Sequence, residues 1–482
     1  MTYQPIIGLE IHAQLQTASK IFCRCRAGFG GEQNSRVCPV CLGMPGALPV
    51  LNKQVVEYAL RIACATHCRV AHQSVFARKN YFYPDLPKGY QISQFEKPLC
   101  ENGFVEIEID GSTIRVGLTR IHLEEDAGKS VHAEEYVSDK ETLIDVNRCG
   151  TPLIEIVSKP ELRSPQEAAR YITYLRQLVQ YLEICDGNME NGSLRCDANV
   201  SVRPEGAGEL GVKTELKNMN SIRGVEKALE FEIERQIEIL ASGGAVLQET
   251  LLWDADKNIA IPMRSKEFSH DYRYFPEPDL VPLDIDEEWI DEVKANLPEL
   301  PMEKKNRFIH QFKIPAYDAQ VLTESKNVAD YFEAVAKSSG DAKASSNWVM
   351  GDVLRTLKEK HIDITDLSVK PDQTGELLKL IHNGTISGKI AKSVFEEMVR
   401  TGESAAAIIE QKGLVQISDT GEIESRVRQV LADNPAEVEK FLNGKEQVIG
   451  FLVGQVMKAT RGKANPKLVN DVLRNELQKT KR

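Results

Sequence analysis

The segment Ile6-Ile7-Gly8-Leu9-Glu10-Ile11-His12-Ala13-Gln14-Leu15 alternates apolar and polar residues, which predicts a β-strand at the start of the fold. Successive side chains of a strand point to opposite faces, so the apolar residues face a core while Glu10, His12 and Gln14 share the other face. A carboxylate beside an imidazole on a rigid strand suits either a divalent cation or proton transfer. The alternative is an ordinary amphipathic strand with a solvated polar face, and this strand alone does not exclude it.

The composition is that of a globular protein of about three domains. The chain has 482 residues, of which 42% are hydrophobic and 27% charged, and its formal net charge is −11. This acidic balance argues against a generally basic nucleic-acid binder, although it leaves room for a local basic patch. The sequence contains neither an apolar run long enough to cross a membrane nor a signal segment, so we expect a cytoplasmic protein with no membrane partner.

Four of the ten cysteines are clustered with the spacing of metal ligands. Cys23 and Cys25 form one pair, Cys38 and Cys41 form the second, and a glycine-rich stretch lies between the pairs. Two thiolate pairs on a short loop can enclose one tetrahedral zinc ion, and such a site is structural because no coordination position is left open. The alternative is four reduced cysteines in a loop.

Basic and aromatic side chains alternate between Arg78 and Gln94, with two prolines and no helix or strand periodicity. Such a segment can stack on a nucleotide while contacting phosphates, or it can pack as an aromatic loop on its own domain. The same mixture returns between Arg264 and Asp279. The sequence contains neither a phosphate-binding loop nor a dinucleotide fingerprint, so any use of ATP requires a less common fold.

Carboxylates stand at the ends of two further expected strands. Residues 104–126 predict a hairpin that turns at Asp110-Gly111, has a bulge between Leu118 and Ile121, and ends in three acids. Those acids form either a solvated turn or a cation site. Glu155 lies inside an apolar strand, where a carboxylate is unfavourable unless it is paired or coordinated. It is the strongest single-residue indication of a metal.

Two later segments define the remaining organisation. Residues 193–203 alternate so that Arg195, Asp197 and Asn199 share a face, which lines a basin or forms an exposed sheet face. A capping box at 164–167 predicts a scaffold helix. Beyond about residue 295 strand alternation ends and helical segments follow, and residues 451–482 carry eight basic and two acidic side chains. This basic tail suits a phosphate backbone, or it is a solvated helix face.

Six motifs carry a resemblance to one family over essentially the whole chain. They are IGLEIH (7–12), RKNYFYPD (78–85), HLEEDAGK (122–129), GTPLIEI (150–156), GSLRCDAN (192–199) and DYRYFPEPD (271–279). Together they resemble the B subunits of aspartyl/glutamyl-tRNA(Asn/Gln) amidotransferases. The resemblance implies an α+β fold: a β-rich cradle domain with an antiparallel sheet and a zinc-binding loop at 23–41 (1–294), an all-helical domain (295–405), and a small helical tail domain that contacts tRNA (406–482).

The resemblance also implies an activity, that of a glutamine-hydrolysing carbon–nitrogen ligase. The family uses ATP to phosphorylate the side-chain carboxylate of Glu-tRNA(Gln), Asp-tRNA(Asn) or both. Ammonia from a glutaminase A subunit then replaces the phosphate, and a small C subunit completes the heterotrimer. The matching non-discriminating aminoacyl-tRNA synthetase is a further candidate partner. The alternative is a non-catalytic tRNA-binding scaffold protein.

Carried onto this sequence, the resemblance assigns individual roles. The Mg²⁺ ligands fall on His12, Glu125 and Glu155, with Glu10 and Glu124 adjacent, and the imidazole also suits Mn²⁺. Catalytic roles fall on Lys79, Tyr81, Arg195 and Asp197, substrate-binding roles on Tyr83, Tyr90, Ser193 and Asn199, and structural zinc on Cys23, Cys25, Cys38 and Cys41.

Overall fold

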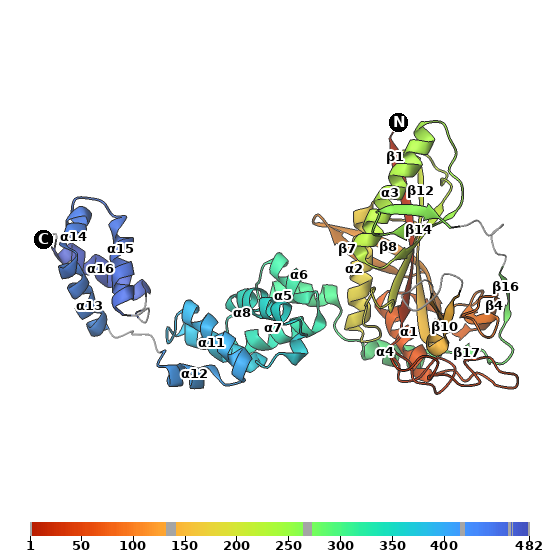
Figure 1. The fold of residues 1–482 in the computed structure, drawn as a ribbon, viewed down its shortest axis with the longest axis horizontal. Helices are drawn as coiled ribbons and strands as arrows, with labels where there is room; N and C mark the ends of the chain where they lie inside the picture. The colour runs from red at the N-terminus through yellow and green to blue at the C-terminus, as the bar shows by residue number, and fades with distance from the viewer. Residues whose placement is uncertain are drawn as a thin grey trace. The chain divides into compact units, whose positions relative to one another are not determined.

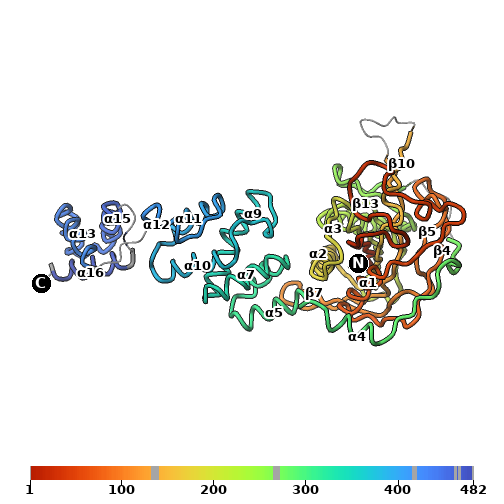
Figure 2. Tube along the Cα trace, turned by 90° about the horizontal axis from the view of Figure 1, so that it is seen from below, coloured from red at the N-terminus to blue at the C-terminus, as the bar shows by residue number. Residues whose placement is uncertain are grey.

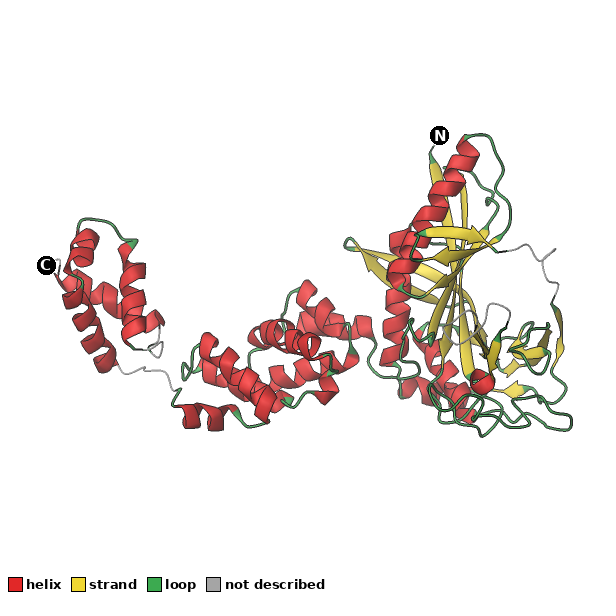
Figure 3. Ribbon diagram, viewed as in Figure 1, coloured by secondary structure: helices red, strands yellow, loops and turns green. Residues whose placement is uncertain are grey.

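A computed structural model describes residues 2–131, 141–263, 272–414, 420–460, 464 and 466–480. The chain divides into two compact units, Met1–Pro301 and Met302–Arg482. Figure 3 shows strands and helices in the first unit and helices in the second. This arrangement confirms the expected α+β fold followed by a helical region.

A ten-stranded sheet dominates the first unit (Figure 1). Its path is β15-β14-β13-β12-β1-β11-β8-β6-β2, with β7 paired to β8. The strands are β1 (Tyr3–Gln14), β2 (Arg69–Val70), β6 (Cys100–Glu101), β7 (Phe104–Ile109), β8 (Ser112–Glu125), β11 (Pro152–Ser158), β12 (Leu194–Pro204), β13 (Thr214–Met219), β14 (Thr250–Asp254) and β15 (Ile259–Pro262). The pairs are antiparallel except β13–β14. The opening strand therefore lies at the centre of the sheet, between β11 and β12.

Helices cover the apolar face of this sheet. They are α1 (Lys53–Ala65), α2 (Pro165–Tyr181) and α3 (Ile222–Ala241), while α4 (Glu287–Ala295) packs on α1. Ile7, Leu9 and Ile11 of β1 are buried in one hydrophobic cluster with side chains of all four helices. Ser164 caps α2 by accepting a hydrogen bond from the backbone N–H of Glu167, as the capping box predicts. The opposite, polar face of the sheet is left for chemistry.

The expected hairpin is confirmed, with β7 and β8 joined at Asp110-Gly111. The expected bulge is also present, because Val157 of β11 pairs with Arg120 while the next residue, Ser158, pairs with Leu118. Two residues of β8 thus advance against one of β11. The bulge decides which side chains at the end of β8 face the polar side of the sheet.

A second sheet contains the first aromatic segment. Its order is β16 (Arg273–Pro276), β4 (Phe76–Asn80) and β5 (Tyr90–Gln94), and β4 and β5 run side by side in Figure 2. The sequence predicted no strand between Arg78 and Gln94, so both ends of that segment are corrected here. Their pairing partner β16 comes from the second aromatic segment, whose residues 264–271 lie outside the described part of the chain. Smaller ladders join β9 (Lys129–Val131) to β10 (Leu143–Asp145) and β3 (Gln73–Ser74) to β17 (Leu283–Asp284).

The second unit is built on two hydrophobic clusters. Its helices are α5 (Pro301–Gln311), α6 (Ala316–Thr323), α7 (Lys326–Ser339), α8 (Ala342–Trp348), α9 (Leu354–Lys360), α10 (Pro371–His382), α11 (Gly388–Thr401), α12 (Ala405–Lys412), α13 (Thr420–Asp433), α14 (Pro435–Leu442), α15 (Val448–Ala459) and α16 (Pro466–Thr480). Ile408 and Ile409 of α12 pack in the first cluster, so the second cluster begins beyond this helix, whereas the sequence placed the tail boundary at 405/406. Among the described residues, no helix is long and apolar enough to cross a membrane.

Candidate active site

Three side chains from three strands meet on the polar face of the large sheet. His12 of β1 is the register partner of Glu155 on β11, and its Nε2 lies 3.4 Å from Glu155 Oε2. The same nitrogen lies 3.6 Å from Oε1 of Glu124, which comes from β8. One ligand atom from each residue lies within 4.8 Å of the other two. An imidazole and two carboxylates at this spacing could hold one metal ion.

Glu125 does not join this group, although the family motifs predict it beside His12 and Glu155. Adjacent residues of a strand point to opposite faces, so Glu125 points away from the side on which Glu124 meets His12. Its carboxylate forms an ion pair with Lys88 and accepts a 2.9 Å hydrogen bond from the backbone N–H of Ile92. The cluster is therefore His12, Glu124 and Glu155.

His122 is a member of the site that was not predicted from the sequence. It is the register partner of Glu155, and its Nε2 lies 3.1 Å from Glu155 Oε2. Burial alone would lower the pKa of His122, but the charges of Glu155 and Glu124 outweigh it and raise the pKa to about 9. Strand alternation offered the signal, because His122 stands two residues before Glu124.

Electrostatics keep this cluster charged. Burial by itself would raise the pKa of Glu155, but His122 and His12 hold that pKa well below its usual range. Burial opposes protonation of His12, yet the hydrogen bond from Glu155 and the charge of Glu124 leave its pKa raised. Burial, followed by the charge of Glu155, raises the pKa of Glu10. Glu155 is thus an anion that imidazolium groups neutralise without a metal and that a cation would neutralise when bound.

Three predicted residues of β12 share the polar face with the cluster. Arg195 is the register partner of His12, and its Nη2 lies 3.0 Å from Asp126 Oδ2. Asp197 lies opposite Glu10 and pairs with Lys217 Nζ at 2.7 Å. Asn199 donates a 3.1 Å hydrogen bond from Nδ2 to Glu10 Oε1. The basin interpretation of this strand therefore fits the structure, with cations and carboxylates in alternation across β1, β12 and β13.

Aromatic side chains stand beside the carboxylates. Lys79 Nζ lies over the ring of Tyr272 at 4.6 Å, and the rings of Tyr81 and Tyr272 are 5.7 Å apart, edge to face. Burial, followed by the charge of Glu124, raises the pKa of Tyr81. Tyr83, whose ring is 6.2 Å from that of Tyr81, is 46% exposed. The first aromatic segment thus presents a cation and two rings close to the cluster.

Two other predicted residues contact their own domain instead. Tyr90 lies under the guanidinium of Arg78, 4.2 Å from its ring centroid, and Arg78 is paired with Glu277. Ser193 is buried, and its hydroxyl donates a hydrogen bond to the backbone carbonyl of Asn188 in the turn before β12. These contacts favour a packing role for both side chains.

The four cysteines form a second cluster, as their spacing predicts. One sulfur from each of Cys23, Cys25, Cys38 and Cys41 lies within 4.8 Å of the others. The backbone N–H of Cys38 donates to Cys41 Sγ at 3.2 Å. Hydrogen bonding to Cys23 lowers the pKa of Cys41 to about 5. The loop could therefore hold a metal such as zinc.

Comparison with known proteins decides the family. Residues 5–291 match a family model described as the GatB/GatE catalytic domain, and residues 330–477 match the GatB domain. The B subunit of the aspartyl/glutamyl-tRNA(Asn/Gln) amidotransferase of Chlorobium phaeobacteroides (strain BS1) is 58% identical over 99% of this chain and 100% of that protein. Its counterpart in Carboxydothermus hydrogenoformans is 56% identical over 99% of each chain. This chain belongs to the family of amidotransferase B subunits.

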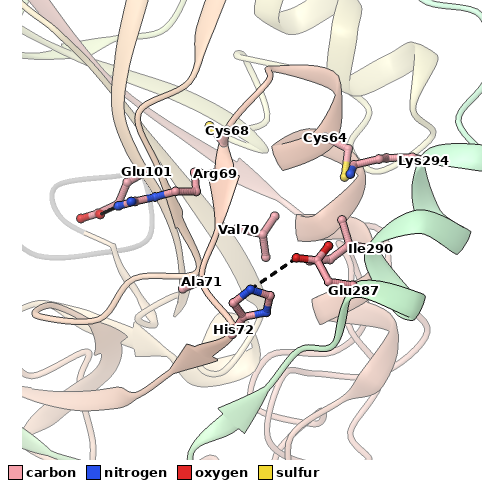
Figure 4. A pocket seen from close by; sticks show the side chains of 10 residues that line it. All are labelled: Cys64, Cys68, Arg69, Val70, Ala71, His72, Glu101, Glu287, Ile290 and Lys294. Atoms are coloured by element: carbon pink, nitrogen blue, oxygen red, sulfur yellow. Dashed lines mark hydrogen bonds and ion pairs between the residues drawn. The ribbon is translucent and has the colours of Figure 1, made fainter.

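The region matched to the catalytic domain of this family contains every member of both clusters. A pocket of about 420 Å³ lies elsewhere in the same unit, beside α1, β2 and α4 (Figure 4). His72 and Glu287 form an ion pair there, with 3.3 Å between His72 Nε2 and Glu287 Oε1. None of the candidate residues named above lines this pocket. The site is thus defined by the polar face of the sheet.

Proposed function

We propose that this chain activates and amidates the amino acid of a misacylated tRNA. A carboxylate oxygen of Glu on tRNA(Gln), Asp on tRNA(Asn) or both attacks the γ-phosphorus of ATP, and ADP leaves. Ammonia then attacks the carbonyl carbon of the acyl phosphate, inorganic phosphate leaves, and the nitrogen loses a proton to give the amide. The single observation that carries this proposal is the cluster of His12, Glu124 and Glu155 on the polar face of the sheet.

The cluster has the donors for a hard divalent cation. Two carboxylates suit Mg²⁺, and the imidazole makes Mn²⁺ an alternative occupant. Such a cation would offset the repulsion between the substrate carboxylate and the phosphates. Since two imidazolium groups stabilise the charge of Glu155 when no cation is present, metal binding should release protons.

The side chains around the cluster supply positioning. Arg195 and Lys79 are cations suited to phosphate or carboxylate oxygens. Tyr81 and the exposed ring of Tyr83 offer surfaces on which a base can stack. Asp197, whose charge is matched by Lys217, and Asn199 complete the wall of the basin.

The partners follow from the chemistry and from the names of the relatives. A glutaminase A subunit would supply ammonia and a small C subunit would complete the complex. The matching aminoacyl-tRNA synthetase could deliver substrate. The helical tail beyond residue 405 would contact tRNA phosphates through basic side chains such as Lys458 and Arg474. Zinc would occupy the four-cysteine cluster as a structural ion.

The deciding experiment measures amide formation by the complete complex with ATP, misacylated tRNA and ammonium chloride in place of glutamine. His12→Ala should reduce the rate by about a thousandfold, because loss of metal charge stabilisation is worth several kcal/mol. tRNA affinity should be retained. Full activity of this variant would refute the site and favour a non-catalytic scaffold.

The tail provides a complementary control. Replacing Lys458 and Arg474 by Gln should weaken tRNA binding and reduce its dependence on salt, because fewer counterions are released. The rate at saturating tRNA should remain high. If these substitutions abolish all function while His12→Ala is silent, the scaffold interpretation is correct.

A further inference from the structure

Lys20 is a buried cation beside the four-cysteine cluster. Its side chain is fully buried, with 0% exposure. Its Nζ lies 3.7 Å from Cys41 Sγ and donates a 2.8 Å hydrogen bond to the backbone carbonyl of Arg36. No carboxylate of the described residues lies within ion-pair distance of this ammonium. Because a buried ammonium is strongly unfavourable without an anion, the sulfur cluster must supply the opposite charge.

We propose that Lys20 is the counter-ion of the metal-loaded four-cysteine centre. Four thiolates around one Zn²⁺ carry a net charge of −2, and one ammonium reduces it to −1. Cys41 is the cysteine that needs this charge most, because it is the buried member of the four, with 3% exposure. The inference rests on the zinc occupancy proposed above.

The same lysine also connects the centre to the strands of the active site. The backbone N–H of Ile21, the next residue, donates to Gly150 O at 3.0 Å. Gly150 has φ +78°, and a Cβ there would lie 3.5 Å from both Cys41 Cβ and Lys20 Cδ. Its backbone N–H donates to Asp126 O at 3.0 Å. Lys20 therefore packs under the turn where β8 ends and β11 begins.

This packing gives the counter-ion a second consequence. Glu124 stands near the end of β8, and Glu155 is the fourth residue of β11. A centre whose charge is balanced can close tightly around its metal and hold the turn between these strands. Occupancy of the cysteine centre should thus favour the geometry of the carboxylates on the polar face.

The test measures zinc affinity of the full-length, reduced chain by competition with a chromophoric chelator. Lys20→Met keeps the length of the side chain without its charge, and Lys20→Gln also keeps a hydrogen-bond donor for Arg36 O. Both should bind zinc at least about tenfold more weakly, the scale of lost interactions just outside a metal's ligands. Lys97→Met, at an exposed position, is the matched control and should bind as wild type does.

Each result separates one failure from another. Wild-type affinity in both Lys20 variants would overturn the counter-ion assignment while leaving zinc in place. Weak binding by Lys20→Met alone would show that the hydrogen bond matters rather than the charge, which also overturns it. No zinc binding by the wild type would refute the proposed occupancy itself, and the counter-ion with it.

Unfolding by denaturant, with and without zinc, covers the case in which a variant is poorly stable. Lys20→Met should destabilise the zinc-loaded protein more than the zinc-free protein, in which the buried ammonium faces a weaker negative charge. Equal destabilisation of both forms would mean that Lys20 supports packing alone, and would overturn the proposal.

Discussion

The two candidate metal centres of this chain differ in how they are assembled. The four cysteines come from one loop, between residues 23 and 41. The carboxylate–histidine cluster comes from β1, β8 and β11, so its first member is separated from the other two by more than a hundred residues. A local centre depends on spacing along the chain, whereas a distributed centre depends on strand register. The first could be predicted completely from the sequence, and the second with one ligand misplaced.

The two centres also differ in what they leave open. Four protein sulfurs can fill a tetrahedral coordination sphere and leave no place for substrate. Three protein ligands on a sheet face leave positions for phosphate or carboxylate oxygens, and the side chains of His12 and Glu155 keep 18% and 13% exposure. The distributed centre is therefore the one suited to chemistry.

The largest expected effect separates the centres by function. Glu155→Gln should lower amide formation by about a thousandfold, since it removes an anion that binds the cation. Zinc content should stay at the wild-type level. Mn²⁺ binding followed by electron paramagnetic resonance, together with metal analysis, checks both statements. Loss of zinc in this variant would mean that the centres are not separate.

The neighbouring glutamates give a sharper comparison at nearly constant sequence. Glu124→Gln should weaken Mn²⁺ binding by about a hundredfold, whereas Glu125→Gln should retain wild-type Mn²⁺ affinity because its carboxylate pairs with Lys88 on the opposite side of the strand. Titration calorimetry with Mn²⁺ measures both. The reverse order would restore the ligand set expected from the sequence and contradict the register of β8.

The features predicted correctly are those that the chain encodes locally. The alternation of β1, the turn at Asp110-Gly111 and the cap at Ser164 each depend on a short run of neighbouring residues. The bulge in β8 could also be read from the apolar parity around Leu118 and Ile121. It has a further consequence, because residues beyond a bulge change faces. Applying that parity to the last residues of β8 would have paired Glu124 with His122.

The features that were missed depend on distant partners. The segment between Arg78 and Gln94 has no strand periodicity, yet β4 forms because β16, nearly two hundred residues later, pairs with it. Ser193 stands in a motif shared with Arg195, but its hydroxyl is used by the turn it closes. Sequence patterns identify which segments matter, and tertiary contacts decide which side chains of those segments are free to act.

A smaller effect is expected from emptying the local centre. Removing zinc with a chelator should lower the melting temperature of the first unit by roughly 10 °C, since tight ligands at high saturation contribute about 4 kcal/mol. Calorimetry on the full chain measures the shift. Cys38→Ser, which already lacks a ligand, should show little further change with the chelator. A chelator effect of equal size in that variant would point to a different metal site.

The smallest effect concerns pH and tests the distributed centre without its cation. The pKa of His122 is about 9 in the folded protein against an ordinary value of 6.5, so the folded state binds the proton more tightly. The resulting stability is fully present below pH 6.5, declines between pH 6.5 and 9, and is lost above pH 9. At about 1.4 kcal/mol per pH unit the total is a few kcal/mol. Denaturant unfolding in the presence of a chelator, over roughly pH 6 to 10, should show this decline in the wild type and a flatter profile in His122→Gln. Parallel profiles would mean that His122 is not protonated beside Glu155, and the two carboxylates would then need another source of positive charge to remain together.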